Sequence, residues 1–328
     1  MSERHFLEDV GKPYSTTPIG DATLWEVSNL PKDSSIPPVL YVVESEIGQH
    51  FLLGRGISGR PKFNMIRYIA KAFVQLFFEK LSGKRLCQYL ILKGAYPFDL
   101  QHAFGIAPPY DLQLLSTGFI KLQRTLNKEK TDWEIQETNL IGEYEGDTWL
   151  IPETTIASGS TVAFFLRHAF QHHLPKQVYV FTACGSLEGV ERIHRECIAV
   201  GVELIPVFSQ CIFEVSKTGN LPNLPFTDLP ILNPGSVTTK RFYQKALARY
   251  QETRMCSVGD VTESLEDPGQ YSLRTLWEMQ ILGMDPKKEN WDDWTVDVRQ
   301  EKFGKGVAHF NPGLHDYFQE IWGDKKRD

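Results

Sequence analysis

The sequence has few cysteines, no excess of basic residues and no long apolar run. Its five cysteines never form a Cys-x-x-Cys pair, which argues against a zinc framework or a disulfide-stapled fold. The sequence has 35 basic and 41 acidic residues, and the resulting net charge of -6 argues against nucleic-acid binding as the main function. The sequence shows neither the charged-then-apolar pattern expected of a signal peptide nor an apolar run of membrane-spanning length. Together these absences predict a cytoplasmic protein with reduced thiols and neither a membrane nor a nucleic-acid partner.

The 328 residues, of which 41% are hydrophobic and 23% charged, are enough to bury one large core or two. Short apolar runs typical of strands alternate with segments of helical periodicity. The expected strands are residues 23–27, 39–43, 86–92, 148–151, 177–182 and 203–207. The expected helices are residues 64–81, 162–170, 187–200, 240–252 and 272–282. This alternation predicts an α/β fold with a doubly wound parallel sheet.

Three parts of the chain are expected to differ in organisation. Residues 1–85 are predicted to form an N-terminal arm or cap and the first long helix, with 46–49 as a turn and 51–53 as a returning hairpin strand. Residues 86–250 carry the strand and helix alternation of a core domain. Residues 251–328 are predicted to be a helical C-terminal extension.

The stretch from Thr148 to Thr161 carries the clearest chemical signal. An apolar strand passes Glu153 and becomes small and hydroxylated at Ser158, Gly159, Ser160 and Thr161, and a helical pattern follows directly. Small residues let backbone N–H groups approach a ligand, and a helix N-terminus attracts anions. A carboxylate at the strand end can accept hydrogen bonds from sugar hydroxyls. The stretch therefore predicts a site for a phosphate with an attached polyol, or else a capped helix of an ordinary α/β protein.

The same stretch resembles the ribose-5-phosphate loop of type I phosphoribosyltransferases. The uracil variant of that loop runs Asp-Pro-Met-Leu-Ala-Thr-Gly-Gly-Ser/Thr, and here Glu153 stands for its first Asp and Ser158 for its Thr. The resemblance implies that Glu153 and Thr154 hold the ribose hydroxyls and a Mg²⁺-bound pyrophosphate. It implies that the 5′-phosphate is bound by Ser158, Gly159, Ser160 and Thr161. Ala157, counted with the donor-binding residues, stands where many members carry the acid that acts near the acceptor, and uracil-type members also have Ala there.

Two segments that precede Glu153 in the chain also resemble this family, and they occur in the same order as in its members. The strand over 86–92 ends in Lys93-Gly94-Ala95, which is similar to the pyrophosphate-binding Leu-Lys-Gly-Gly-Tyr-Lys-Phe turn of hypoxanthine-guanine phosphoribosyltransferases. Residues 116–125 resemble the segment before the family's flexible catalytic loop, expected here over 123–134. The resemblance implies that Arg124, Lys128 or Lys130 stabilises the leaving pyrophosphate. An ordinary turn and a solvated charge run are the alternatives.

The resemblance is weaker in the segments that would recognise the acceptor of the transferred ribose-5-phosphate. Residues 183–193 look like the Ala-Pro-Glu-Gly-Val segment of the uracil enzymes, and Gly185 stands near where purine enzymes often carry a lysine. The proline-rich segment 220–235 is distantly like the hood over uracil but lacks its Gly-Asp step. A purine acceptor is therefore disfavoured, and the acceptor stays open among pyrimidines, modified bases and other amines.

The resemblance covers about residues 86–236 and implies an enzyme of nucleotide metabolism. It would transfer ribose-5-phosphate from phosphoribosyl pyrophosphate to a nucleobase-like nitrogen acceptor, with Mg²⁺, as a homodimer. Two alternatives stay open. One is a non-catalytic regulator of the same fold that senses a nucleotide or phosphoribosyl compound. The other is an enzyme that transfers or cleaves a ribosyl group from another nucleotide donor.

Overall fold

The computed structural model describes residues 5–14, 22–30, 35–53, 59–92, 95, 98, 100–106, 112, 114–126, 133–214 and 236–253. The chain divides into two compact units. The first comprises Met1–Gln49, Ile66–Asn223 and Leu232–Lys245, and the second His50–Met65, Leu224–Ile231 and Ala246–Asp328. The helix predicted at 272–282 and the hood-like segment 220–235 lie outside the described residues.

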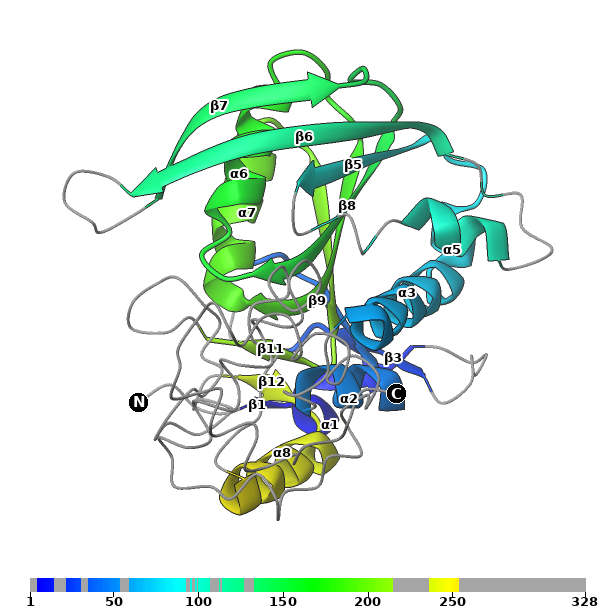
Figure 1. Cartoon of the computed structure of the whole chain (residues 1–328), viewed down its shortest axis with the longest axis vertical. Helices are drawn as coiled ribbons and strands as arrows, with labels where there is room; N and C mark the ends of the chain where they lie inside the picture. Colours follow the sequence, from blue (N-terminus) through cyan, green and yellow to red (C-terminus); the bar gives the residue numbers. More distant parts are fainter. Residues whose placement is uncertain are drawn as a thin grey trace, which may run out of the picture. The chain divides into compact units, whose positions relative to one another are not determined.

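The first unit carries one mixed sheet whose centre is parallel (Figure 1). The main strand order is β2-β3-β4-β10-β9-β8-β5-β6-β7, in which β4 to β6 run parallel and β2, β3 and β7 add antiparallel edges. The strands are β1 His5–Phe6, β2 Gly11–Pro13, β3 Thr23–Val27, β4 Leu40–Glu44, β5 Leu86–Leu92, β6 Leu114–Leu126, β7 Trp133–Ile141, β8 Thr148–Ile156, β9 Gln177–Ser186, β10 Glu203–Ser209, β11 Cys211–Phe213 and β12 Val237–Thr238. The predicted α/β class with a parallel sheet is confirmed.

Eight helices are assigned among the described residues. They are α1 Leu7–Val10, α2 Glu46–Leu53, α3 Gly59–Leu76, α4 Phe78–Leu81, α5 Leu100–Ile106, α6 Ser160–Ala169, α7 Leu187–Ala199 and α8 Lys240–Thr253. In this part of the chain, no helix combines the length and the apolar character needed to cross a membrane. The predicted helix over 64–81 begins earlier, at Gly59, and is interrupted at Phe77, whose backbone leaves the helical region.

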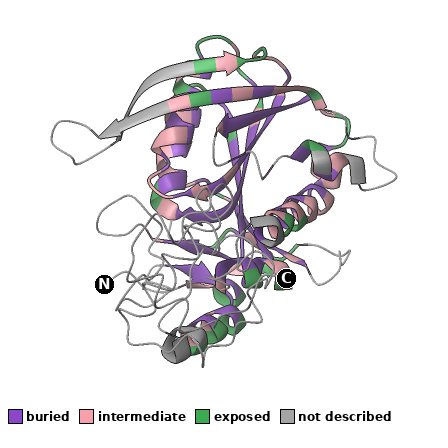
Figure 2. Cartoon of the chain, in the orientation of Figure 1, coloured by how far each residue is buried: buried purple, intermediate pink, exposed green. Residues whose placement is uncertain are grey.

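Each face of the central strands is covered by helices, as alternating side chains require. On one face, α6 and α7 lie side by side and bury Phe165 and Ile193 against Trp149 and Val180 (Figure 1). On the other face, Phe73 of α3 stacks on Phe181 of β9 with ring centroids 5.4 Å apart. Burial on both faces explains why the central strands are almost wholly purple in Figure 2.

The predicted hairpin over residues 46–53 is wrong, since these residues form α2. Ser45 caps this helix: its hydroxyl accepts from the N–H of Gly48 at 3.1 Å, and its carbonyl accepts from Gln49 at 3.0 Å. The apolar residues Ile47 and Phe51 are four positions apart, which suits one helix face. The serine before the apolar run was the available signal for a helix start.

Four of the five cysteines fall in the described residues, and all four are buried free thiols. Burial raises the pKa of the Cys197 thiol to about 12 and raises the pKa of Cys184 and Cys211 as well. Thiols that stay protonated are poor nucleophiles. The described cysteines therefore pack as small apolar side chains, as the sequence predicts.

Candidate functional site

The candidate site lies where the order of the central strands reverses. From β5 the chain adds β6 on one side, whereas from β8 it adds β9 and then β10 on the other side. Strands β5 and β8 are adjacent and parallel, so their carboxyl ends meet at one edge of the sheet. Open parallel sheets bind ligands in the crevice at such a switch point. Of the two motifs singled out in the sequence, one directly follows β5, and the other begins at Glu153 in the last residues of β8 and continues into the loop after it.

The loop after β8 turns at Gly159, which has φ 70° and ψ 0° and precedes the first turn of α6. This left-handed conformation is open to glycine and disfavoured for residues with a Cβ. A Cβ built on Gly159 would lie 2.2 Å from the carbonyl oxygen of Gly189. Glycine is thus required both by the backbone conformation and by the close approach of α7.

The polar residues of this loop stand at the N-terminus of α6, whose first two residues are Ser160 and Thr161. The hydroxyls of Ser158 and Ser160 are 3.1 Å apart, and both residues, like Thr161, are partly exposed. Alpha6 has ten residues, so the positive end of its dipole lies at this turn. Hydroxyl donors at such a terminus suit a phosphate or carboxylate ligand.

Glu153 and Thr154 stand near the carboxyl end of β8. The Glu153 carboxylate accepts from the backbone N–H of Thr154 at 2.9 Å and faces its hydroxyl at 3.4 Å. Thr154 is buried, whereas Glu153 is partly exposed. The carboxylate of Glu153 therefore lies near the carboxyl end of β8, and its position is stabilised by the N–H and hydroxyl of Thr154.

Ser186 connects the loop of Gly159 to the N-terminus of α7. This buried residue caps α7: its hydroxyl accepts from the N–H of Gly189 at 2.9 Å and donates to the carbonyl of Ala157. A Cβ on Gly189 would lie 2.5 Å from that same carbonyl oxygen. The first turn of α7 and its cap therefore hold the loop backbone at Ala157, two residues before Gly159.

Replacing Ser186 by alanine is expected to weaken binding at the loop as well as stability. The change leaves the Ala157 carbonyl and the Gly189 N–H without their partner, at roughly 1–3 kcal/mol, and it removes a helix cap. We expect affinity for phosphoribosyl pyrophosphate, measured by calorimetry, to fall by about tenfold, since roughly 1.4 kcal/mol corresponds to that factor.

The control for this experiment is Cys197→Ala, which removes buried atoms at the far end of the same helix. It should lower the free energy of unfolding without changing the affinity. Equal affinity of Ser186→Ala and the wild type, at matched folded fractions, would contradict a positioning role for the hydroxyl.

The turn after β5 is only partly described. Ala95 is buried; its N–H donates to the carbonyl of Ile91 at 3.2 Å, and its carbonyl accepts from Phe98 at 2.8 Å. Lys93 and Gly94 lie outside the described residues. The buried side chain of Gln88 accepts from the N–H of Leu100 at 2.7 Å, which joins the start of α5 to β5. The turn thus has both ends anchored at the edge that carries Glu153.

Arg124 lies on β6, where its backbone pairs with Ile135 of β7. Its side chain and residues 127–132, with Lys128 and Lys130, lie outside the described part. The loop predicted over 123–134 is shorter than expected, because β6 continues to Leu126 and β7 begins at Trp133. The structure therefore brings Ala95, Glu153, Thr154 and the loop from Ala157 to Thr161 to one edge of the sheet. For Arg124 it shows only the position of the backbone on β6.

Sequence reasoning missed the roles of Ser186 and Gly189. It assigned residues 183–193 to the acceptor side, whereas the contacts of these two residues are with the loop of Gly159. A hydroxyl residue directly after an apolar strand and before a helical pattern was the available signal for the cap. The close approach of the two glycines has no local sequence signal.

No family model matches the chain, and no curated protein matches it in sequence. Solved structures similar to parts of it include the AQ2163 protein of Aquifex aeolicus, at 17% identity, 54% of this chain, 90% of that chain and a TM-score of 0.39. They also include a hypoxanthine phosphoribosyltransferase from Staphylococcus aureus, at 21% identity, 37% of this chain, 62% of that chain and a TM-score of 0.30. An orotate phosphoribosyltransferase from Aeropyrum pernix has 11% identity, with 44% of this chain, 72% of that chain and a TM-score of 0.30.

Proposed function

We propose that the protein transfers ribose-5-phosphate from phosphoribosyl pyrophosphate to a nucleobase-like nitrogen acceptor and releases pyrophosphate. In this reaction the bond from C1′ of the ribose to the pyrophosphate oxygen breaks, and a bond from C1′ to the acceptor nitrogen forms. The acceptor nitrogen loses its proton and pyrophosphate leaves with the bonding electrons. The proposal is of a pentosyl transferase that uses a small-molecule acceptor.

The observation that carries the proposal is the left-handed turn at Gly159 at the N-terminus of α6, beside the carboxylate of Glu153. The turn offers N–H groups and hydroxyls to a 5′-phosphate. Glu153 is one residue before Thr154 on the same edge and would accept from the ribose hydroxyls. The combination suits a phosphate joined to a polyol better than an isolated anion, which would need no carboxylate.

The donor set also fits a Mg²⁺ ion that is held mainly by the substrate. Among the described residues there is no group of three or more His, Cys, Asp or Glu side chains that could hold a metal by themselves. Magnesium commonly uses one or two carboxylates together with substrate phosphates and water. Glu153 would supply the protein oxygen, and the bound ion would neutralise charge on the leaving pyrophosphate.

A sensor of a nucleotide or phosphoribosyl compound is the second candidate. The observation that favours it is Thr154, which is buried where an acidic residue is expected from the resemblance, so one carboxylate stands instead of two. Such a protein would bind the donor without turnover. Pyrophosphate release in the presence of a panel of acceptors separates the two, and product analysis would also reveal a different ribosyl donor.

The first experiment is a calorimetric titration with phosphoribosyl pyrophosphate and Mg²⁺. We expect micromolar binding by the wild type and about 10- to 100-fold weaker binding by Glu153→Gln, because a hydrogen bond to a charged group contributes roughly 1.5–3 kcal/mol. The matched control is Glu203→Gln, which changes an exposed residue at the amino end of β10. It should bind like the wild type. Absence of wild-type binding would overturn the donor site, and full affinity of Glu153→Gln would overturn the role of Glu153.

A further inference from the structure

The start of the chain forms the outer strand of a four-strand row at the carboxyl end of β9. Strand β1 pairs in parallel with β12, β12 pairs with β11, and β11 pairs in parallel with β9. In this register His5 lies opposite Val237. Val237 lies opposite Ile212, which in turn lies opposite Gly185. Three strand spacings, or about 14 Å, therefore separate the N-terminal strand from β9.

The inner end of this row stabilises the loop of Gly159. Gly185 is followed by Ser186, whose backbone pairs with Phe213 of β11. The hydroxyl of Ser186 donates to the carbonyl of Ala157, and the residue is fully buried. A shift of β11 against β9 therefore moves the residue that holds the loop backbone.

Strand β11 has different supports at its two ends. It begins after Gln210, which has φ 63° and whose N–H donates to the carbonyl of Val43 on β4 at 2.9 Å. A residue with a long side chain rarely adopts such a conformation. Ile212 pairs instead with β9 on one side and with β12 on the other. Among the described strands, β12 is thus the support of β11 on the side away from β9.

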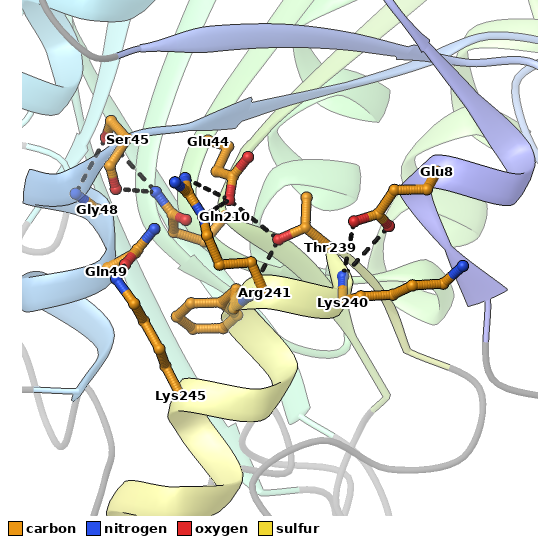
Figure 3. Close-up of polar contacts among 11 residues, drawn as sticks. Glu8, Glu44, Ser45, Gly48, Gln49, Gln210, Thr239, Lys240, Arg241 and Lys245 are labelled. Atoms are coloured by element: carbon orange, nitrogen blue, oxygen red, sulfur yellow. Dashed lines mark hydrogen bonds and ion pairs between the residues drawn. The ribbon is translucent and has the colours of Figure 1, made fainter.

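The outer end of the row is a segment that we call the N-terminal strap, residues 5–9. The carboxylate of Glu8 accepts from the backbone N–H of Lys240, at 2.9 and 3.2 Å for its two oxygens, and so caps α8 (Figure 3). Asp9 pairs with the ammonium of Lys240 at 3.2 Å, and this ammonium lies 5.6 Å from the ring centroid of Phe6. The strap therefore joins the start of the chain to a helix 232 positions away.

The strap is exposed, whereas the residues next to it are buried. The side chains of Lys240 and Asp9 are 52% and 58% exposed, and exposed ion pairs contribute little and are screened by salt. Thr238 of β12 is buried. Thr239 and Glu44 are also buried, and their hydrogen bond of 3.0 Å joins the start of α8 to β4 independently of the strap (Figure 3). The strap can therefore detach locally while α8 stays bound.

We propose that the N-terminal strap is a conformational device that sets how firmly the loop of Gly159 is held. With the strap bound, β12 is paired on both sides and supports β11, which keeps Ser186 against the carbonyl of Ala157. Release of the strap removes one of the two strand neighbours of β12 and loosens the loop. Glu8 is thus a positioning residue, because it acts on the loop through these strands. The effect on phosphoribosyl pyrophosphate rests on the proposed function, whereas the effect on the loop backbone does not.

The test is hydrogen–deuterium exchange of the full chain, read by mass spectrometry, together with calorimetric titration of phosphoribosyl pyrophosphate and Mg²⁺. The variant Phe6→Ala/Glu8→Ala removes the ring and the cap. We expect exchange in residues 157–160 and 185–190 to become about threefold to tenfold faster, and donor affinity to fall by a similar factor. High salt should raise the exchange of the wild type in the same two segments, because it screens the ion pair of the strap.

The control is Lys12→Ala, which removes an exposed ion pair with Glu26, at 2.9 Å, between β2 and β3. It should change neither exchange in these segments nor donor affinity. Glu8→Gln keeps an acceptor oxygen for the N–H of Lys240 and should stay close to the wild type, which a role of the charge alone would not allow. Ser186→Ala is the positive control for faster exchange at the loop.

The exchange measurement decides the proposal even if the donor does not bind. Unchanged exchange of residues 157–160 and 185–190 in the double variant, whatever happens in residues 236–241, would overturn it, because the strap would then stabilise α8 and nothing beyond. Faster exchange at the loop in a protein that does not bind phosphoribosyl pyrophosphate would uphold the strap and reject the proposed donor site.

Discussion

Gly159→Ala is expected to weaken binding of phosphoribosyl pyrophosphate by about 10²-fold. An added Cβ would lie 2.2 Å from the Gly189 carbonyl oxygen, and φ at this position is 70°. The obstacle is backbone, so no side chain can rotate out of the way. The loop or the start of α7 has to shift, and a displacement of about 1 Å at a site can weaken it by about 10²-fold. The free energy of unfolding should also fall, by roughly 2–5 kcal/mol from strain and overpacking together.

Gly201→Ala is the matched control for this prediction. Gly201 has φ 72°, and a Cβ there meets nothing within 4 Å. It precedes β10 at the amino end of the sheet, away from the loop. The control should lose roughly 1–2 kcal/mol from the left-handed backbone and keep the donor affinity of the wild type. If Gly159→Ala binds the donor as well as Gly201→Ala does, the loop is not a phosphate site.

Trp149→Ala is expected to lower the free energy of unfolding by roughly 3–5 kcal/mol. Trp149 is fully buried on β8, with its ring centroid 4.9 Å from Tyr89 and 5.8 Å from Phe170. Its indole N–H donates to the carbonyl of Glu145 at 2.7 Å, and truncation leaves that carbonyl unsatisfied. The loss is a large fraction of the stability of a typical domain, which is about 5–15 kcal/mol.

Urea unfolding followed by circular dichroism measures this effect. The control is Tyr68→Ala, because Tyr68 is 60% exposed on α3 and its loss should change stability by no more than about 0.5 kcal/mol. The stability loss of Trp149→Phe should lie between those of Trp149→Ala and Tyr68→Ala, since phenylalanine keeps an aromatic ring but lacks the indole N–H. A loss below about 1 kcal/mol for Trp149→Ala would mean that the α6 and α7 face is not the main core.

The central strands were predictable because their apolar runs are continuous. The prediction over 86–92 coincides with β5. Strand β9 extends four residues beyond the predicted end at 182, because Gly185 pairs with Ile212 of β11, a contact that no local pattern records. The loop around Gly159 was singled out by its small residues, and its left-handed turn at the start of a helix is as expected from them.

The buried polar cluster of Glu44, Ser45, Ser209 and Gln210 at the carboxyl ends of β4 and β10 was not predictable from the sequence. It depends on the pairing of β4 with β10, and the bond from Gln210 to Ser45 joins positions 165 residues apart. A glutamine between two strands carries no signal of positive φ, which glycine or asparagine would have given. Long-range strand pairing and backbone strain are the physical reasons why this part of the edge remained hidden.

The contact between Gly159 and Gly189 also constrains how sequences with this loop can diverge. A side chain at Gly159 meets the carbonyl of Gly189, and a side chain at Gly189 meets the carbonyl of Ala157, at 2.5 Å. Neither position can gain a Cβ while the other backbone stays in place. Because the two residues touch, the effects of their substitutions should not be additive. Descendants of this chain that keep the loop should therefore keep both glycines, and those that lose one should show relaxed variation at the other.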